Sequence, residues 1–220
     1  YNYKGIRFRE TRKKEGRAPD AKTTAMQEAG SKYVFEYVLN NKRSGYSTLN
    51  KFMTDKKFMD GLREVYPDVD SDWLDAYWKQ HKKILELFSS TQINKFDHTG
   101  GFMDFISKLI RDNFGISKKD NWNPSDIWGV RGSSTAVMKK LEETVFGSRD
   151  SQTIQQLNAV MRGMYKANDL VGISLKKTSG NVARWEEYNI EKLTLNEVDE
   201  YKYKDIKIII NFKPTQNLNH

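Results

Sequence analysis

The segment Asn123-Pro124-Ser125-Asp126-Ile127-Trp128-Gly129-Val130 begins as a polar turn and continues as a short apolar run. This pattern predicts a strand at about 127–131 that begins just after Asp126. A second segment, Asp169-Leu170-Val171-Gly172-Ile173-Ser174-Leu175-Lys176-Lys177, alternates apolar residues with small or polar ones. Its period of two predicts a strand at 170–177 with Ser174 and Lys176 on one face.

A helix is expected near the start of the chain. Thr24-Ala25-Met26-Gln27 fits the capping-box pattern, which predicts a helix beginning there and running to about Leu39. Its apolar stripe includes Phe35, so Glu28, seven residues earlier, lies near the inward-facing side of the first turn. This position gives Glu28 the potential to reach a buried site.

The rest of the chain is mainly helical in pattern. Apolar residues recur at intervals of three and four from about 55 to 115, with Gly115 as the expected end of a helix. Two more helices are expected at about 134–146 and 151–167, and a last strand at 206–212. The predicted fold class is α/β, with a small mixed sheet flanked by helices.

The composition limits the chemistry that the protein can perform. Its 220 residues include no cysteine and three histidines, which excludes thiol nucleophiles, disulfides and zinc–cysteine sites. Any metal must therefore be a hard ion held by oxygen atoms. No apolar run approaches the roughly 18 residues of a membrane span, which excludes a channel or transporter. The net charge of +8 favours a polyanionic partner such as nucleic acid.

The first 22 residues form a strongly basic segment, with eight Lys or Arg residues against three acidic ones. Such a segment is either a solvated arm or an electrostatic contact to phosphates, and the charge pattern does not decide between them. We expect this arm, 1–22, to precede a single domain at 23–220 that carries a helical insertion at about 50–115.

Familiar catalytic signatures such as the P-loop, G-x-S-x-G and H-E-x-x-H motifs are absent. His81 and His98 are expected to be ordinary surface or capping residues. What remains is a set of oxygen ligands and one cation: Glu28, Asp126 and the strand end Ser174-Leu175-Lys176. Phosphodiester hydrolysis needs a hard cation bound by such oxygens, and an ammonium group beside them stabilises the developing charge.

The order of these elements, a helix with a Glu, then P-x-D, then a strand ending in x-x-K, resembles the PD-(D/E)XK nuclease superfamily, to which many restriction endonucleases belong. The strings Gln27-Glu28, Asn123-Pro124-Ser125-Asp126-Ile127-Trp128 and Gly172-Ile173-Ser174-Leu175-Lys176-Lys177 are also similar to those of bacteriophage proteins of that fold. The resemblance implies a restriction-endonuclease-like fold.

The resemblance also implies a role for each site residue. Asp126 and Glu28 would bind Mg²⁺ or Mn²⁺, the carbonyl of Leu175 would contribute to the same ion, and Lys176 would orient or activate water. Ser174 stands where the superfamily has an acid, so it brings a hydroxyl without a negative charge. Ser174 also follows Asp126 by 48 positions, which exceeds the usual spacing.

The implied function is that of a Mg²⁺-dependent nuclease, with DNA as the expected substrate, acting in the host cytoplasm or the virion if a phage encodes it. We expect phosphate contacts from the basic arm and from short polar donors past the strand, namely Arg12, Lys13, Lys14, Lys177, Ser179 and Asn181. Two alternatives remain open. One is a catalytically inactive nuclease-fold protein that binds nucleic acid or a virion partner. The other is a virion structural protein whose basic arm touches packaged DNA.

Overall fold

The computed structural model describes residues 5–9, 21–117, 122, 125–146, 153–175 and 184–188. All of these belong to one compact unit, Tyr1–Ile190. The helices are α1 Ala21–Asn41, α2 Leu49–Thr54, α3 Lys56–Val65, α4 Ser71–Phe88, α5 Gly101–Phe114, α6 Ser134–Phe146 and α7 Ile154–Lys166. The strands are β1 Gly5–Arg9, β2 Ile93–Asp97, β3 Ile127–Arg131, β4 Leu170–Ser174 and β5 Arg184–Tyr188.

The described strands form one sheet in the order β2-β3-β4-β1-β5. The three strands β2, β3 and β4 are antiparallel, β1 joins β4 in parallel, and β5 pairs with β1 in antiparallel fashion. Ile127 pairs with Ile173 and Val130 with Leu170, so the predicted strands at 127–131 and 170–177 are neighbours. The α/β class and the small sheet are confirmed.

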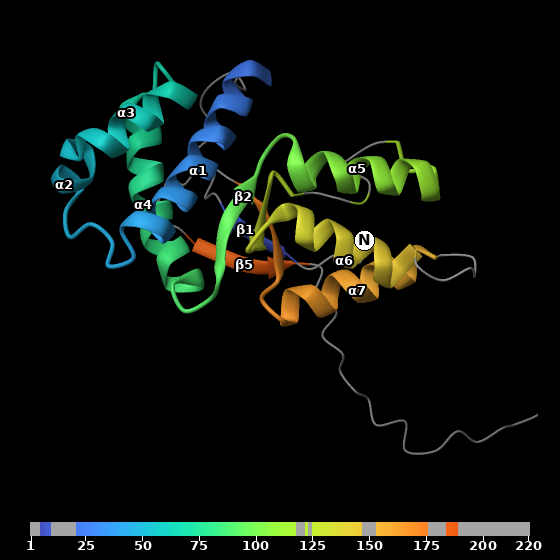
Figure 1. The fold of residues 1–220 in the computed structure, drawn as a ribbon. Coiled ribbons are helices and arrows are strands. Elements are labelled where there is room, and N and C mark those ends of the chain that lie inside the picture. Colours follow the sequence, from blue (N-terminus) through green and yellow to red (C-terminus); the bar gives the residue numbers. More distant parts are fainter. Residues whose placement is uncertain are drawn as a thin grey trace, which may run out of the picture. The chain divides into compact units, whose positions relative to one another are not determined.

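Helices cover both faces of this sheet, with α1 to α4 on one side and α5 to α7 on the other (Figure 1). Successive side chains of β3 point to opposite faces of the sheet, so this strand contributes residues to the hydrophobic clusters on both faces. Ile127 belongs to the hydrophobic cluster formed with α1, α3 and α4. Trp128 and Val130 belong to the cluster formed with α5, α6 and α7, where the Trp128 ring lies 5.1 Å from that of Phe102.

Local signals account for most helix boundaries. The side chains of Thr48, Asp55 and Asp70 accept hydrogen bonds from the first turns of α2, α3 and α4. Thr153 begins α7 with a capping box, and Gly115 ends α5 at φ 66°, as its predicted capping role requires. The helices predicted at 134–146 and 151–167 are confirmed as α6 and α7.

Two sequence predictions about helices are wrong. α1 begins at Ala21, so Thr24 and Gln27 lie inside the helix and do not cap it, because the preceding Ala and Lys are good helix formers that extend it. The helical block expected at 55–115 contains the strand β2. A register shift between Ile93 and Lys95 marks a β-bulge, which hides the period of two that identifies a strand.

Two further predictions, about the N-terminal segment and about His81, also need correction. Residues 5–9 of the expected arm form β1, in which Ile6 and Phe8 alternate with Gly5, Arg7 and Arg9 in the way typical of a strand. His81, expected at the surface, is fully buried. The strand predicted at 206–212 lies outside the described residues.

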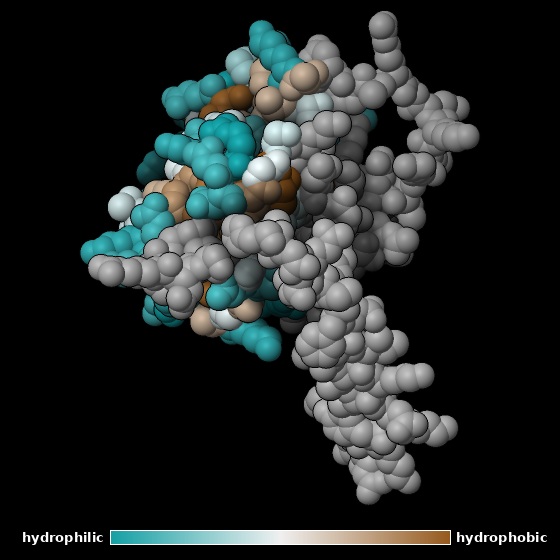
Figure 2. All heavy atoms as spheres, turned by 90° about the vertical axis from the view of Figure 1, so that its right-hand side faces the viewer, coloured by the Kyte–Doolittle hydropathy of each residue, from teal (hydrophilic) through white to brown (hydrophobic). Residues whose placement is uncertain are grey.

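The surface of the described residues is mainly hydrophilic on one face. On the face drawn in Figure 2, hydrophilic side chains predominate among the described residues, with hydrophobic atoms in smaller areas between them. Within the described ranges, none of the helices combines the length and the apolar character that crossing a bilayer requires.

Candidate functional site

The start of β3 and the end of β4 meet at one end of the sheet, where Asp126 lies. The backbone N–H of Asp126 donates a hydrogen bond to the carbonyl of Ile173 over 2.8 Å. The carboxylate Oδ2 of Asp126 accepts hydrogen bonds from the backbone N–H of Leu175 at 2.6 Å and from the hydroxyl of Ser174 at 3.3 Å. These bonds hold the half-buried carboxylate against the end of β4.

The strand register explains why these residues meet. Ile127 and Ile173 are paired in antiparallel strands, so the residue before Ile127 lies opposite the residue after Ile173. Two of the predicted site residues, Asp126 and Ser174, are therefore brought together from positions far apart in the sequence. Leu175 contacts Asp126 through its backbone N–H, and the predicted use of its carbonyl by a metal stays a prediction.

Ser174 has a clear physical role in this arrangement. It is buried, with 5% of its surface exposed, and its hydroxyl donates to Asp126. An acid at this position would place two carboxylates side by side, and their repulsion would raise the pKa of one of them. A serine at this position avoids that repulsion beside Asp126.

Glu28 makes a different contact from the one that its predicted role requires. Its Oε2 lies 2.7 Å from Nε2 of His98, the residue that directly follows β2. Both side chains are largely buried, with 24% and 11% of their surface exposed. Glu28 is hydrogen-bonded to His98, whereas Asp126 is hydrogen-bonded to Ser174 and to the backbone of Leu175.

The two pairs nevertheless lie at the same end of the sheet. Asp97 pairs with Trp128 across β2 and β3, so His98 lies at the end where β3 begins and β4 finishes. The backbones of β2 and β4 are separated there by two strand spacings, about 10 Å. Asp97 itself is occupied in supporting the helices, because its Oδ2 accepts from the N–H of Phe102 at 2.8 Å and from Ser134 Oγ at 2.6 Å.

A metal ion at this end of the sheet would have few protein ligands among the described residues. Within the described residues, no group of three or more His, Asp or Glu side chains converges closely enough to hold a metal ion. Mg²⁺, however, keeps several waters and is often bound by one or two carboxylates together with substrate phosphates. Asp126 fits this requirement as a carboxylate ligand, and the Ser174 hydroxyl fits as a partner of a coordinated water.

The other predicted site residues lie outside the described ranges: Lys176, Lys177, Ser179, Asn181, Arg12, Lys13 and Lys14. His98 is the residue that the sequence analysis missed. His98 can be identified by its position just after β2. The β-bulge in β2 interrupts the alternation that would have identified this strand in the sequence. Once β2 is recognised, its end falls beside the start of β3, and His98 becomes a candidate for the site.

Comparison of the chain with protein-family models, with curated proteins and with solved structures gave no match.

Proposed function

We propose that the protein is a metal-dependent nuclease with a restriction-endonuclease-like fold that hydrolyses phosphodiester bonds in nucleic acid, with DNA as the expected substrate. The observation that supports this proposal is the Asp126 carboxylate, which accepts hydrogen bonds from Ser174 and Leu175 where β3 begins and β4 ends. In the PD-(D/E)XK arrangement that the sequence resembles, this is the junction between the metal-binding Asp and the x-x-K strand.

Each residue of the site has a chemical task in this proposal. A bound Mg²⁺ would polarise the phosphoryl oxygen and lower the pKa of a coordinated water. Asp126 would hold the ion through its carboxylate, and Ser174 keeps that carboxylate oriented. Lys176, which the sequence pattern predicts on the face of Ser174, would stabilise negative charge that develops on the phosphoryl oxygens.

Glu28 contributes the second negative charge to the proposed site. The His98 ring, hydrogen-bonded to its carboxylate over 2.7 Å, limits the rotamers available to Glu28. With α1 packed against β2, Glu28 reaches the end of the sheet from a different element than Asp126 does. We infer that Glu28 holds a coordinated water near the phosphate and that His98 is a positioning residue.

The test of this function is a cleavage assay on single-stranded and duplex DNA and on RNA, with Mg²⁺, Mn²⁺ or EDTA. We expect cleavage with the metals and none with EDTA. Asp126→Asn keeps an oxygen that can accept from the N–H of Leu175 but removes the charge, so it should abolish cleavage and preserve binding. Asp112→Asn, at an exposed acid on α5, is the matched control. Full cleavage by Asp126→Asn would refute the proposal.

One observation favours a second candidate, a nuclease-fold protein without catalysis that binds nucleic acid or a virion partner. Ser174 is neutral and already hydrogen-bonded to Asp126, so the pair is satisfied without a metal. Such a protein would bind nucleic acid equally well in Mg²⁺ and in EDTA and would leave it intact. The same assay therefore separates the two candidates.

A further inference from the structure

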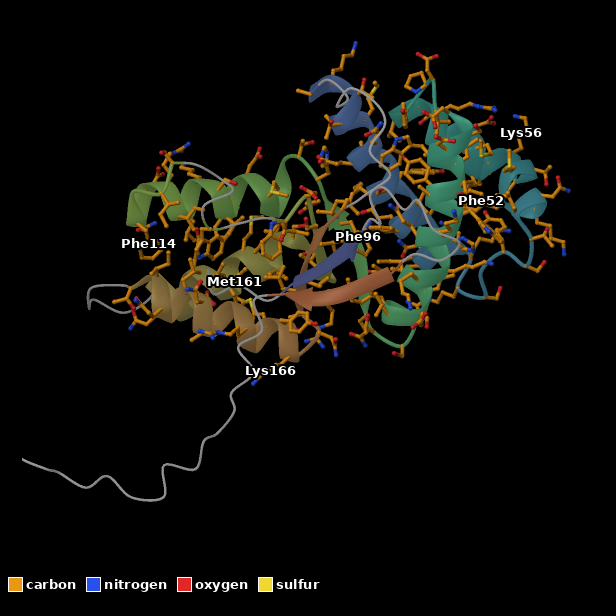
Figure 3. All side chains as sticks on the ribbon, turned by 180° about the vertical axis from the view of Figure 1, so that it is seen from behind. Phe52, Lys56, Phe96, Phe114, Met161 and Lys166 are labelled. Carbon is orange, nitrogen blue, oxygen red and sulfur yellow. The ribbon has the colours of Figure 1, made fainter. Side chains whose placement is uncertain are left out.

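A polar pocket of about 570 Å³ lies where the loop after α1 meets α2 and the start of α3. Its described lining contains no Val, Leu, Ile or Met side chain and includes Lys42, Ser44, Gly45, Ser47, Lys51 and Asp55. In Figure 3, the labelled Phe52 and Lys56 mark α2 and the start of α3, each one residue from a lining residue. The pocket is separate from Glu28 of the candidate site, because Lys42 follows Glu28 by 14 positions, about 21 Å along the axis of α1.

Tyr46 holds the loop of this pocket in place. It is buried, its backbone N–H donates to Nε2 of His81 over 3.4 Å, and its hydroxyl donates to Oδ2 of Asp55 over 2.8 Å. Its ring lies 5.4 Å from that of Phe52, so α2 packs against the same residue. The turn before it has Gly45 at φ 72°, a conformation that glycine adopts readily. The polar groups of the loop are therefore held in position before a ligand binds.

The pocket carries an excess positive charge. The Lys42 ammonium lies 3.3 Å from Oδ2 of Asp55, so these two charges balance each other. The other oxygen of Asp55 accepts a hydrogen bond from the N–H of Phe58 at 3.1 Å. The Lys51 side chain, by contrast, is exposed, and its ammonium has no carboxylate within ion-pair distance among the described residues. One lysine charge in the pocket is therefore available to an anion.

Two exposed serines add hydrogen-bond donors to this charge. Among the residues that the structure describes, the hydroxyls of Ser44 and Ser47 donate to no partner. We propose that the pocket binds a phosphate group, with Lys51 supplying the positive charge and the two serines supplying hydrogen bonds. A phosphate oxygen accepts hydrogen bonds from hydroxyl groups, and a lysine ammonium attracts it as a point charge.

The size of the pocket indicates that the phosphate is attached to a larger group. Sites that enclose a whole small molecule measure roughly 300–1,000 Å³, and this pocket lies within that range. Its polar lining suits a carrier with hydroxyl groups and not a hydrocarbon chain. The ligand is therefore a sugar phosphate, either free or as part of a nucleic-acid backbone. Its binding goes beyond the proposed function, because it does not require that the protein cleave its ligand.

The test is an NMR titration of the isotope-labelled full chain in EDTA. Ribose 5-phosphate should shift the amide signals of Ser44, Gly45 and Ser47, and ribose without a phosphate should leave them unchanged. Lys51→Gln should weaken the binding of ribose 5-phosphate about fivefold, and Lys51→Arg, which keeps a cation, should retain it. Lys57→Gln is the matched control and should leave the affinity nearly unchanged, because Lys57 is an exposed lysine outside the pocket lining.

A single-stranded oligonucleotide, titrated in the same buffer, identifies the source of the phosphate. If it shifts the same amide signals and Lys51→Gln weakens its binding, the pocket takes the phosphates of a nucleic-acid backbone. If it leaves these signals unchanged while ribose 5-phosphate shifts them, the ligand is a free sugar phosphate. Because EDTA is present throughout, and Asp126→Asn should bind both ligands like the parent, a failure of cleavage does not affect this result.

Three outcomes would overturn the phosphate pocket. The first is that neither phosphate-bearing ligand shifts the signals of the loop, and the second is that ribose shifts them as much as ribose 5-phosphate does. The third is an equal loss of affinity in Lys51→Gln and Lys57→Gln, which would indicate general charge attraction. The same spectra establish that each variant is folded, as expected for two exposed lysines.

Discussion

The hydroxyl of Ser174 lies 3.3 Å from Oδ2 of Asp126, where the end of β4 meets the start of β3. Ser174→Asp should therefore destabilise the protein in EDTA, because two carboxylates then share a half-buried site. The expected loss is about 1–2 kcal/mol, or on the order of 5 °C in Tm for a chain of this size. Thermal unfolding with and without Mg²⁺ measures it.

Magnesium should reverse this loss if the position binds metal. At a Mg²⁺ concentration of about 100 times Kd, the gain is about 2.7 kcal/mol. Ser174→Ala, which removes the hydroxyl without adding a charge, is the control and should show no larger response to Mg²⁺ than the parent. If the Tm of Ser174→Asp does not rise when Mg²⁺ is added, this end of the sheet is not a metal site.

The contact between His98 and Glu28 predicts a graded effect of substitution. His98→Ala should cost about 1 kcal/mol of stability, because a partly buried carboxylate loses its hydrogen bond. His98→Gln retains a donor and should restore most of that loss. If His98 positions Glu28 for cleavage, kcat should fall in His98→Ala, KM should change little, and His98→Gln should recover. Equal kcat values in the two variants would contradict the positioning role.

The buried His81 predicts a dependence of stability on pH. Burial lowers its pKa from 6.5 to about 4, and the nearby Lys82 charge acts in the same direction, against the contact with the Trp78 carbonyl. Between these two values the unfolded chain binds a proton that the folded chain does not. Stability is therefore complete above pH 6.5 and declines as the pH falls towards 4, by up to about 3 kcal/mol.

Urea unfolding at pH 7.5, 5.5 and 4.5 measures this effect. The variant His81→Gln keeps an oxygen that can accept from the backbone N–H of Tyr46, which donates to His81 Nε2 over 3.4 Å. It removes the titrating group, so its stability should decline less between pH 6.5 and 4 than that of the parent. Parallel pH profiles for the two proteins would exclude His81 as the cause.

Close packing between α1 and α4 gives a prediction about helix glycines. A Cβ atom at Gly30 would lie 2.1 Å from the hydroxyl oxygen of Tyr77, which is fully buried and donates to the carbonyl of Gln27. Gly30→Ala should destabilise the protein by about 1–3 kcal/mol, even though alanine favours helices. Denaturant unfolding measures the change, and adding Tyr77→Phe should recover part of it.

The matched control for this prediction is Gly163→Ala. Gly163 lies in α7 and has no atom within 4 Å of the position of an added Cβ. The same substitution should there stabilise the protein by up to about 1 kcal/mol, from helix propensity alone. Similar effects at the two glycines would show that the contact with Tyr77 is not tight.

The parts of the fold that follow simple periodicity were predictable from the sequence. β3 and β4 have clear apolar patterns, and the end of α5 has the glycine that its left-handed backbone requires. The strand β2 was not predictable, because its bulge interrupts the alternation. β1 was hidden for another reason: its five residues lie in a segment whose charge dominates the local pattern, and their pairing with β4 depends on residues far along the chain.

The same distinction applies to the candidate site. Asp126 and Ser174 were predictable as partners because each lies at the end of a recognisable strand, and the antiparallel register then brings them together. The contact between Glu28 and His98 depends on how α1 packs across β2, and no local pattern encodes that packing. Contacts of this kind can be identified only from the three-dimensional structure.

The pairing of β1 with β4 sets an order of events during synthesis. Gly5 pairs with Gly172, so 167 positions separate the partners. A ribosome that adds roughly 5–20 residues per second needs roughly 8–33 s to cover that interval. Helices α1 to α4 and strand β2 are complete long before β4 exists. β1 is translated before the other described strands but is among the last of them to pair, and until then its unpaired edges are open to chaperones or to other chains.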